Sequence, residues 1–192
     1  MASQPTTDLD QLNKTLQAIS PIANGNRQLP PVEKWNPEFC ADIGMEIRKD
    51  GSWWHEGTKF SRQKLVRLFS TILRKDDDGS TYLVTPYEKV IVHVEDAPFI
   101  GVRVDAAQKD ETPVILVTTN LGDSVEVSAE NPLRVETDEE TGEPSPYVLI
   151  RGRLEAKLSR PAFYELVEYA EEKDGALFVR SNGDDFSLGQ FE

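Results

Sequence analysis

Two stretches of this chain carry apolar residues at the 3.6-residue spacing of an amphipathic helix, and they correspond in order. Shifting the first set by 98 residues gives the second: Leu65, Leu68, Phe69 and Ile72 become Phe163, Leu166, Val167 and Ala170. Each stretch follows a large apolar residue and Ser-Arg (60–62 and 158–160), and each leads into an aromatic-containing strand (81–84 and 176–179). The repeated order predicts an internal duplication.

The two helix starts share a physical signature. A serine oxygen can accept hydrogen bonds from the free backbone N–H groups of a first helical turn, so Ser61 and Ser159 are candidate N-caps. Pro161 suits the first turn of the second helix, where its missing N–H costs little. We therefore expect helices that end near Leu73 and near Ala170.

The pattern elsewhere is typical of strands. Residues 45–48 alternate between apolar and polar, and 53–55 would pair with them across an Asp-Gly turn at 49–52. β-branched stretches predict further strands at 90–94, 100–104, 113–118, 124–127, 131–135 and 147–154, and residues 8–19 predict a short helix. Short connections favour antiparallel pairing. We predict an α+β fold with two related motifs, each a curved antiparallel sheet packed around an amphipathic helix.

This pattern divides the chain into three parts. We expect an N-terminal helix and Pro-rich arm over 1–40, a first sheet–helix unit over 41–105, and a second over 106–192. The two units would share a core or an interface.

Composition narrows the classes of partner. The net charge of −13 argues against nucleic acid and against an anionic membrane surface, because both require a cationic protein face. No apolar run is long enough to span a bilayer, and residues 1–5 have neither the charged head nor the apolar core of a signal peptide, so we expect none here. Cys40 is the single cysteine, which excludes an internal disulfide and favours an inert, buried thiol. We expect a cytoplasmic protein.

The two helical stretches differ in charge. Six bases and no acid lie between residues 59 and 75, namely Lys59, Arg62, Lys64, Arg67, Arg74 and Lys75. The second stretch instead carries Glu165, Glu168, Glu171, Glu172 and Asp174. Three interpretations of this charge difference are open. The two faces are simply solvated, or the basic face meets an acidic one in the same molecule or in a dimer mate, or the basic helix binds an anionic ligand or partner.

Catalytic signatures are absent from the sequence. It has no phosphate-binding glycine loop, nucleophile elbow or paired C-x-x-C, so we expect no cofactor and no metal. His55 is either a general base or a histidine at the sheet surface. Trp53 and Trp54 would face opposite sides of their strand, and the outward one needs a cover, either the Pro-rich segment or a ligand or partner.

Several segments together resemble the bacterial family catalogued as domain of unknown function 1285. The likeness runs in order over nearly the whole chain after residue 28: 29–32, 35–43, 51–58, 64–69, 84–90, 94–99, 131–135 and 146–152. The resemblance implies a duplicated motif of a sheet curled around a helix, no established activity, and a role in signal transduction suggested by shape. It supplies no catalytic residues.

We interpret the chain as a non-enzymatic module that binds a small anionic ligand or a protein partner and can form a homodimer. The predicted ligand-binding surface lies near a groove between the halves and comprises Trp53, Trp54, His55, Arg62, Arg151 and Arg160. Arginine forks suit carboxylates and phosphates, although structural contacts to carbonyls are the other interpretation of these arginines. The alternatives are a small enzyme with His55 as general base, assisted by Glu56 or Asp96, and a peptide-binding scaffold.

Overall fold

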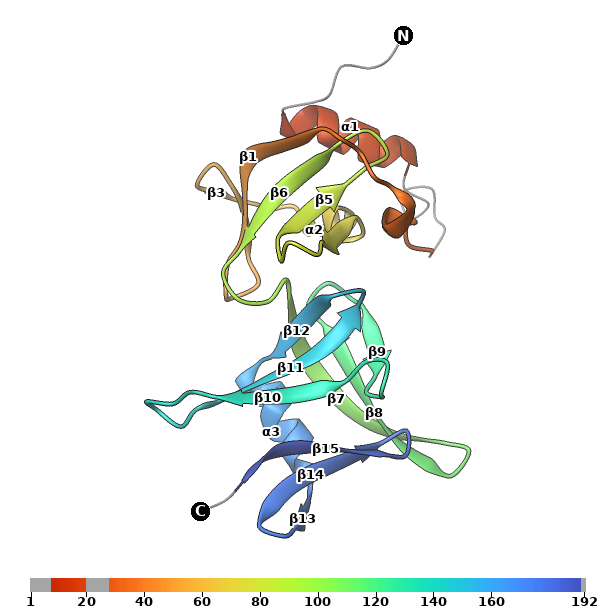
Figure 1. The fold of residues 1–192 in the computed structure, drawn as a ribbon, viewed down its shortest axis with the longest axis vertical. Coiled ribbons are helices and arrows are strands. Elements are labelled where there is room, and N and C mark those ends of the chain that lie inside the picture. The colour runs from red at the N-terminus through yellow and green to blue at the C-terminus, as the bar shows by residue number, and fades with distance from the viewer. Residues whose placement is uncertain (1–7, 20–27, 191–192) are drawn as a thin grey trace. The chain divides into compact units, whose positions relative to one another are not determined.

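The computed structural model describes residues 8–19 and 28–190 and divides into two compact units, Met1–Asp96 (unit 1) and Ala97–Glu192 (unit 2). Both units are drawn in Figure 1. The division falls before the expected boundary at residue 105, because the long strand β7 (Phe99–Lys109) runs through that position and belongs wholly to unit 2. The segment before residue 8, used above in the localisation prediction, lies outside the described residues.

Unit 1 is built on a six-stranded sheet in the order β3-β2-β1-β6-β5-β4. Its elements are α1 (Leu9–Ile19), the 3-10 helix η1 (Val32–Lys34), β1 (Cys40–Ile47), β2 (Trp53–His55), β3 (Thr58–Lys59), α2 (Gln63–Ser70), β4 (Leu73–Lys75), β5 (Thr81–Val84) and β6 (Lys89–Val94). The predicted first hairpin is confirmed, with Ile47 opposite Trp53 and the positive-φ Gly51 in its turn. Helix α2 contributes Val66, Leu68 and Phe69 to the core.

Unit 2 repeats this sheet and adds a second, smaller one. Its six-stranded sheet has the order β10-β11-β12-β7-β8-β9, and a three-stranded sheet has the order β13-β14-β15. The elements are β7, β8 (Thr112–Thr119), β9 (Ser124–Glu126), β10 (Leu133–Thr137), β11 (Pro144–Arg151), β12 (Leu154–Leu158), α3 (Arg160–Glu168), β13 (Glu171–Lys173), β14 (Ala176–Ser181) and β15 (Asp184–Gln190). Helix α3 packs on β7, and β14 and β15 lie beside β8 and β10.

The two six-stranded sheets have the same topology. Each consists of two three-stranded meanders joined at the centre by a parallel pair of the first and the last strand, β1 with β6 and β7 with β12. The prediction of two related α+β units is therefore confirmed, with one correction. The sheets are mixed rather than antiparallel, because the central pair in each joins strands that are far apart in sequence.

The 98-residue offset holds only locally. It maps β4 onto β13, which begin at residues 73 and 171, so the order of a helix and three following strands is repeated in this register. The two six-stranded sheets match in another register, in which β1–β6 correspond to β7–β12. In this register α2 lies between the third and the fourth strand of its sheet, whereas α3 follows the sixth. The helices thus occupy different positions in two otherwise matching sheets.

The helix boundaries correct one of the two predicted caps. Ser159 is the N-cap of α3, and its hydroxyl accepts a hydrogen bond from Ala162 N at 3.3 Å. In contrast, the N-cap of α2 is Arg62, without a side-chain cap, so Ser61 lies one residue too early. Helix α2 also ends at Ser70, and the Thr71 hydroxyl donates back to Leu68 O at 2.7 Å, which favours termination there.

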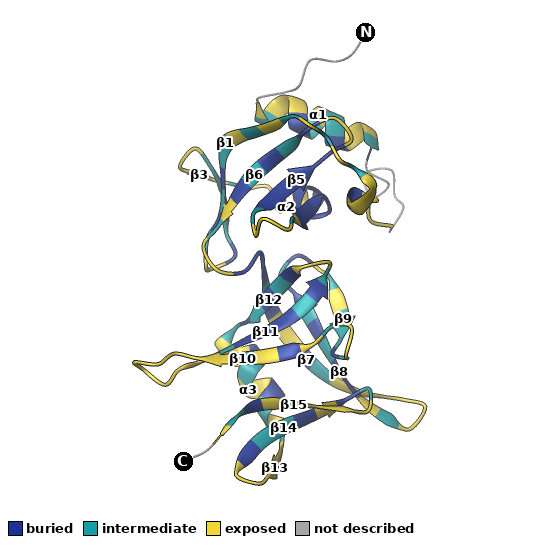
Figure 2. Cartoon of the chain, viewed as in Figure 1, coloured by how far each residue is buried: buried dark blue, intermediate teal, exposed yellow. Residues whose placement is uncertain are grey.

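Most of the buried residues of each unit are apolar. Figure 2 shows in dark blue where the buried residues lie along the chain. Trp53, Phe69, Ile72 and Leu83 are among the most buried residues of unit 1, and Phe99, Val117, Val148 and Leu166 are their counterparts in unit 2. Among the described residues, no helix combines the length and the apolar character needed to cross a membrane.

Candidate functional site

Strand β2 places Trp53 and Trp54 on opposite faces of the sheet in unit 1. Trp53 is 2% exposed, whereas Trp54 lies on the partly exposed face. The cover of Trp54 is its own hairpin, because the Arg48 guanidinium stacks 3.7 Å from the ring centroid and the indole N–H donates to Ser52 Oγ at 2.8 Å. Further cover of this ring by the Pro-rich segment, a ligand or a partner stays a prediction.

His55 lies next along β2 among aromatic rings. Its ring centroid is 6.5 Å from that of Phe60, which in turn packs edge-on against Phe69 at 5.9 Å. Within the described part of the chain, no hydrogen bond or ion pair links the His55 ring to a carboxylate. An aromatic neighbour gives a general base neither orientation nor charge stabilisation, so this setting does not favour the enzyme alternative.

The other histidine pairs with an acid at the sheet surface. His93 Nε2 lies 2.8 Å from Asp42 Oδ2, and Asp42 also accepts from Gly44 N at 2.9 Å. The Gly44 hydrogen bond, followed by the His93 contact, lowers the pKa of Asp42. Both side chains are about half exposed, which is typical of a surface pair rather than a catalytic one.

The three predicted arginines fall in different settings. Arg62 precedes α2 in unit 1 and is exposed. Arg151 in unit 2 contacts Asp123 Oδ1 at 2.9 Å, and its guanidinium lies 5.0 Å from the Phe99 ring centroid. Arg160 pairs with Glu143 in the same unit. The predicted site over all six residues therefore comprises Trp53, Trp54, His55 and Arg62 in unit 1, and Arg151 and Arg160 in unit 2. Its assembly into a single surface stays a prediction.

A group of bases stands out on and before α2. This group, here the basic helix face, consists of Lys59, Arg62, Lys64 and Arg67, all of them exposed. In residues 8–19 and 28–190, none of the four has a carboxylate within ion-pair distance. Lys64 and Arg67 are neighbours on the helix surface because they are three residues apart. Arg62 and Lys64 also lie at the positive end of the helix dipole, which disfavours bases, so local helix stability does not explain them.

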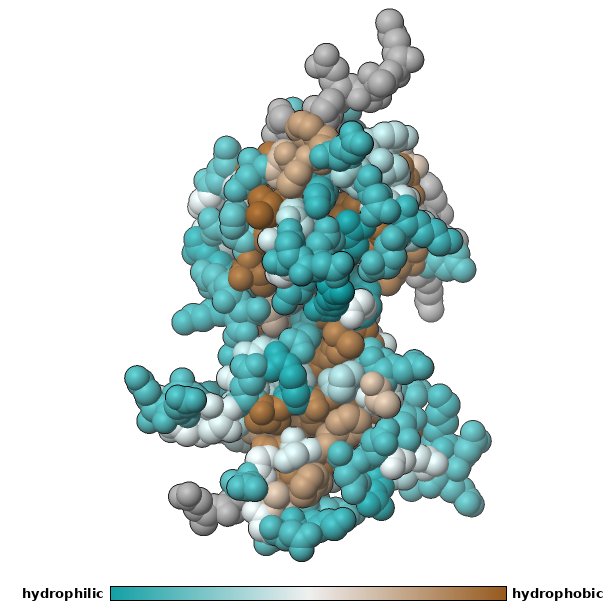
Figure 3. Space-filling model, in the orientation of Figure 1, coloured by the Kyte–Doolittle hydropathy of each residue, from teal (hydrophilic) through white to brown (hydrophobic). Residues whose placement is uncertain are grey.

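The arginines of unit 2, in contrast to the basic helix face, are mostly paired with acids. Five arginines there contact an acid of their own unit: Arg103, Arg134, Arg151, Arg160 and Arg180. Unit 1 contains 12 Lys or Arg and 14 Asp or Glu, a net charge of −2, while unit 2 contains 9 and 20, a net charge of −11. Figure 3 shows many hydrophilic side chains on the drawn face of both units. The larger part of the acidic excess lies in unit 2.

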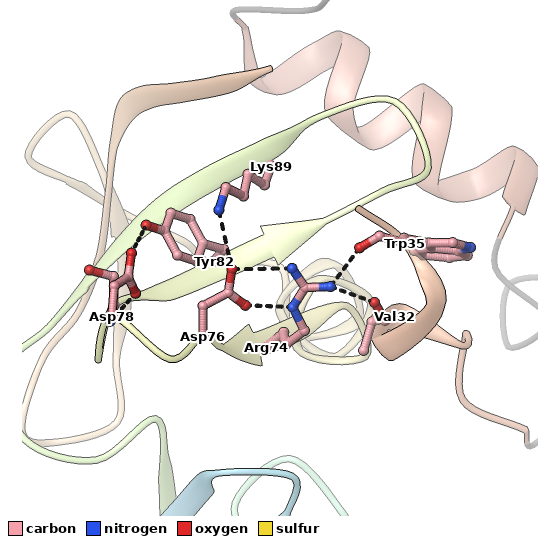
Figure 4. A network of polar contacts seen from close by, with 8 residues as sticks. Val32, Trp35, Arg74, Asp76, Asp78, Tyr82 and Lys89 are labelled. Carbon is pink, nitrogen blue, oxygen red and sulfur yellow. Dashed lines mark hydrogen bonds and ion pairs between the residues drawn. The ribbon is translucent and has the colours of Figure 1, made fainter. Parts of the chain in front are cut away.

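Sequence reasoning misplaced Arg74, which it grouped with the exposed bases. The side chain is buried at 9% exposure and donates to two backbone carbonyls, Val32 O at 2.7 Å and Trp35 O at 2.6 Å. It also binds both carboxylate oxygens of Asp76, at 2.6 and 3.2 Å, and Lys89 Nζ approaches the same carboxylate at 3.2 Å (Figure 4). We call these residues the Arg74 clasp, since they fasten the segment around η1 to β4.

The acidic turn after β4 is part of this arrangement. Asp78 accepts from Ser80 N at 2.8 Å and from the Tyr82 hydroxyl at 2.8 Å, and Lys89 lies 4.2 Å from the centre of the Tyr82 ring. The described residues contain no group of three or more His, Cys, Asp or Glu that could hold a metal ion. Cys40, expected to be buried, is exposed at the start of β1.

Comparisons with known proteins cover almost the whole chain. Family models match the "Domain of unknown function (DUF1285), N-terminal domain" at residues 30–97 and the "Protein of unknown function (DUF1285), C-terminal domain" at 98–188. No curated protein matches the chain.

Two solved structures are similar to this one. A DUF1285 family protein from Silicibacter pomeroyi DSS-3 is 40% identical with a TM-score of 0.84, and the match covers 97% of each chain. A DUF1285 family protein from Shewanella baltica OS155 is 31% identical with a TM-score of 0.53, over 66% of this chain and 91% of that one. The two matched models, the shared two-unit architecture and the resemblance seen in the sequence agree, and the chain belongs to the DUF1285 family.

Proposed function

We propose that this protein is a partner-binding module whose basic helix face docks onto an acidic protein surface. One observation carries the proposal: Lys59, Arg62, Lys64 and Arg67 are exposed on a segment without acids, and no carboxylate among the described residues pairs with them. The paired arginines of unit 2 would bind an acidic partner less strongly, because an acid of their own unit already neutralises each of them.

An extended partner fits this face better than a compact ligand does. The bases are distributed along β3, the approach to α2 and the helix itself, and they project from exposed positions. A carboxylate-bearing surface can contact several such bases at once, and the long side chains adapt to it at modest cost. A role in signal transduction, implied by the family resemblance, stays a prediction.

A fluorescein-labelled oligoglutamate peptide is a suitable probe for the basic helix face. The wild-type protein should bind it with an affinity that falls as salt rises, because exposed charge contacts are screened over about 10 Å at about 0.1 M salt. The variant Arg62→Glu/Lys64→Glu/Arg67→Glu should bind about tenfold or more weakly, since each exposed pair contributes up to about 1 kcal/mol.

The control removes the same net charge elsewhere. Lys34, Lys49 and Lys173 are exposed and lie outside the basic helix face, so Lys34→Glu/Lys49→Glu/Lys173→Glu should retain most of the peptide binding. Equal loss in the two triple variants would reduce the effect to net charge and would refute the docking proposal, as would a failure of the wild type to bind.

A further inference from the structure

We infer that the acidic surface recognised by the basic helix face lies on a second copy of this chain, on α3 and β13 of unit 2. This inference rests on the proposed function, because it names the partner for the same bases. The region, here the acidic helix face, comprises two tyrosines and three glutamates around the end of α3 and on the edge strand β13: Tyr164, Glu168, Tyr169, Glu171 and Glu172. Glu171 and Glu172 are successive strand residues and point to opposite sides of β13.

The three glutamates resemble the four bases of the basic helix face in setting, because they lie at exposed positions on neighbouring elements. Glu168 ends α3, and Glu171 and Glu172 follow on β13, the edge strand of the small sheet. All three are exposed, and over the described ranges 8–19 and 28–190 none lies within ion-pair distance of a base. Each face therefore presents charges without a close ion-pair partner among the described residues of its own unit, although Glu171 still interacts with Arg180 and Lys59 with Asp50 at longer range.

Two tyrosines give the acidic helix face its second property. Tyr164 is 65% exposed and Tyr169 is 44% exposed, which makes them two of the few large apolar side chains exposed on the described surface. Tyr164 is one helical turn from Glu168, so a ring and a carboxylate adjoin. Arginine and lysine pack over tyrosine rings through cation–π contacts, and tyrosine and arginine are enriched in protein interfaces. A surface that presents exposed tyrosine rings next to glutamates can therefore bind the arginines and lysines of a partner.

Charge distribution favours a copy of the same chain over an unrelated acidic protein. Unit 2 carries a net charge of −11 and unit 1 only −2, so a contact between unit 1 of one copy and unit 2 of another joins the least acidic surface to the most acidic. Complementary potentials of this kind set orientation and suppress contacts between like-charged faces. Closed homodimers are also the commonest assemblies of soluble proteins.

A charge exchange between the two faces tests the inference by sedimentation velocity. The wild-type protein should dimerise at about 100 μM in low salt and dissociate as salt is raised to about 0.5 M. Arg62→Glu/Lys64→Glu/Arg67→Glu should be monomeric, and so should Glu168→Lys/Glu171→Lys/Glu172→Lys. An equimolar mixture of the two variants should form a heterodimer, because each reversed face then meets a reversed partner.

The mixture also distinguishes a loss of complementary charge from misfolding as the cause of a monomeric variant. A variant that fails to fold would not form a heterodimer with the other variant. A monomeric wild type at about 100 μM in low salt would overturn the inference, as would two folded variants that remain monomeric when mixed. The oligoglutamate experiment judges the proposed function separately: peptide binding by a monomeric wild type would leave the docking face in place and remove only the second copy as its partner.

Discussion

Replacing Arg74 with alanine should destabilise unit 1 far more than any neighbouring charge replacement. The guanidinium donates to two backbone carbonyls and binds Asp76, and its side chain is 10% exposed against 19% for Asp76. A buried acceptor left without its donor costs about 1–3 kcal/mol, and breaking a buried ion pair costs about 3–5 kcal/mol. Lys89 still contacts Asp76 in the variant, which moderates the loss, so we expect about 3–4 kcal/mol.

Tryptophan fluorescence can follow this change without interference from unit 2. All three tryptophans, at positions 35, 53 and 54, belong to unit 1. With a denaturant slope of about 2 kcal/mol per molar urea, the loss should move the midpoint down by about 1.5–2 M. Lys75→Ala, at the exposed position next to Arg74, should leave the midpoint nearly unchanged.

Unfolding of Arg74→Ala and Lys75→Ala at the same urea concentration would refute this prediction. The Arg74 clasp would then contribute no more than a surface charge, and the segment around η1 would be held by its apolar contacts alone. Arg74→Lys should have a urea midpoint between those of the wild type and Arg74→Ala. Lysine keeps the charge but cannot bind two carbonyls and a carboxylate with one planar fork.

Three further results are expected. Arg48→Ala should uncover the Trp54 ring, shift its emission to longer wavelength and cost about 0.5–1 kcal/mol of cation–π stabilisation; an unchanged spectrum would contradict the stacked geometry. Ser159→Ala should lower the stability of unit 2 by about 1 kcal/mol in circular dichroism melts, whereas Ser61→Ala, at a position that caps nothing, should have little effect. Hydrogen bonding from the arginine of the clasp lowers the pKa of Asp76, so its contribution to stability is fully present above about pH 4 and is lost as the pH falls further; urea midpoints of unit 1 that stay level on acidification would exclude this.

Local patterns predicted the elements that depend on local physics. The Asp-Gly turn identified the β1–β2 hairpin, and apolar spacing identified α1 together with the positions of α2 and α3. Ser159 caps its helix as expected, and Pro161 helps to fix the start of that helix. These features involve residues only a few positions apart, so a single sequence carries the information.

Contacts between residues far apart in sequence could not be predicted from these local patterns. Periodicity shows that a strand exists but not which strand it joins, so the parallel pairing of β1 with β6 left no signal. Arg74 lies between Leu73 and Lys75 in β4, and nothing local indicates that its partners include Val32 O, 42 residues away in sequence. The stacking of Arg48 on Trp54 was missed for a different reason, since its partner lies within the same hairpin rather than in a separate segment.

The candidate surface was predicted in part. The run of bases before and along α2 was visible in the sequence, but the structure was needed to remove Arg74 from it and to show that Arg151 and Arg160 are neutralised by acids of their own unit. Whether a charged side chain is paired depends on tertiary neighbours, which composition does not encode.

The central parallel pair has a consequence for how each unit is made. Cys40 lies beside Lys89 and Phe99 beside Ala156, so the middle of each sheet joins residues about 50 apart, a high contact order for which loop closure comes before the stabilising contacts. On the ribosome, the first meander of a unit emerges with its inner edge uncovered and stays so until the last strand has been synthesised. Each unit should then acquire its structure in a single late cooperative step, and truncation within β6 or β12 should leave an aggregation-prone chain rather than a smaller folded one.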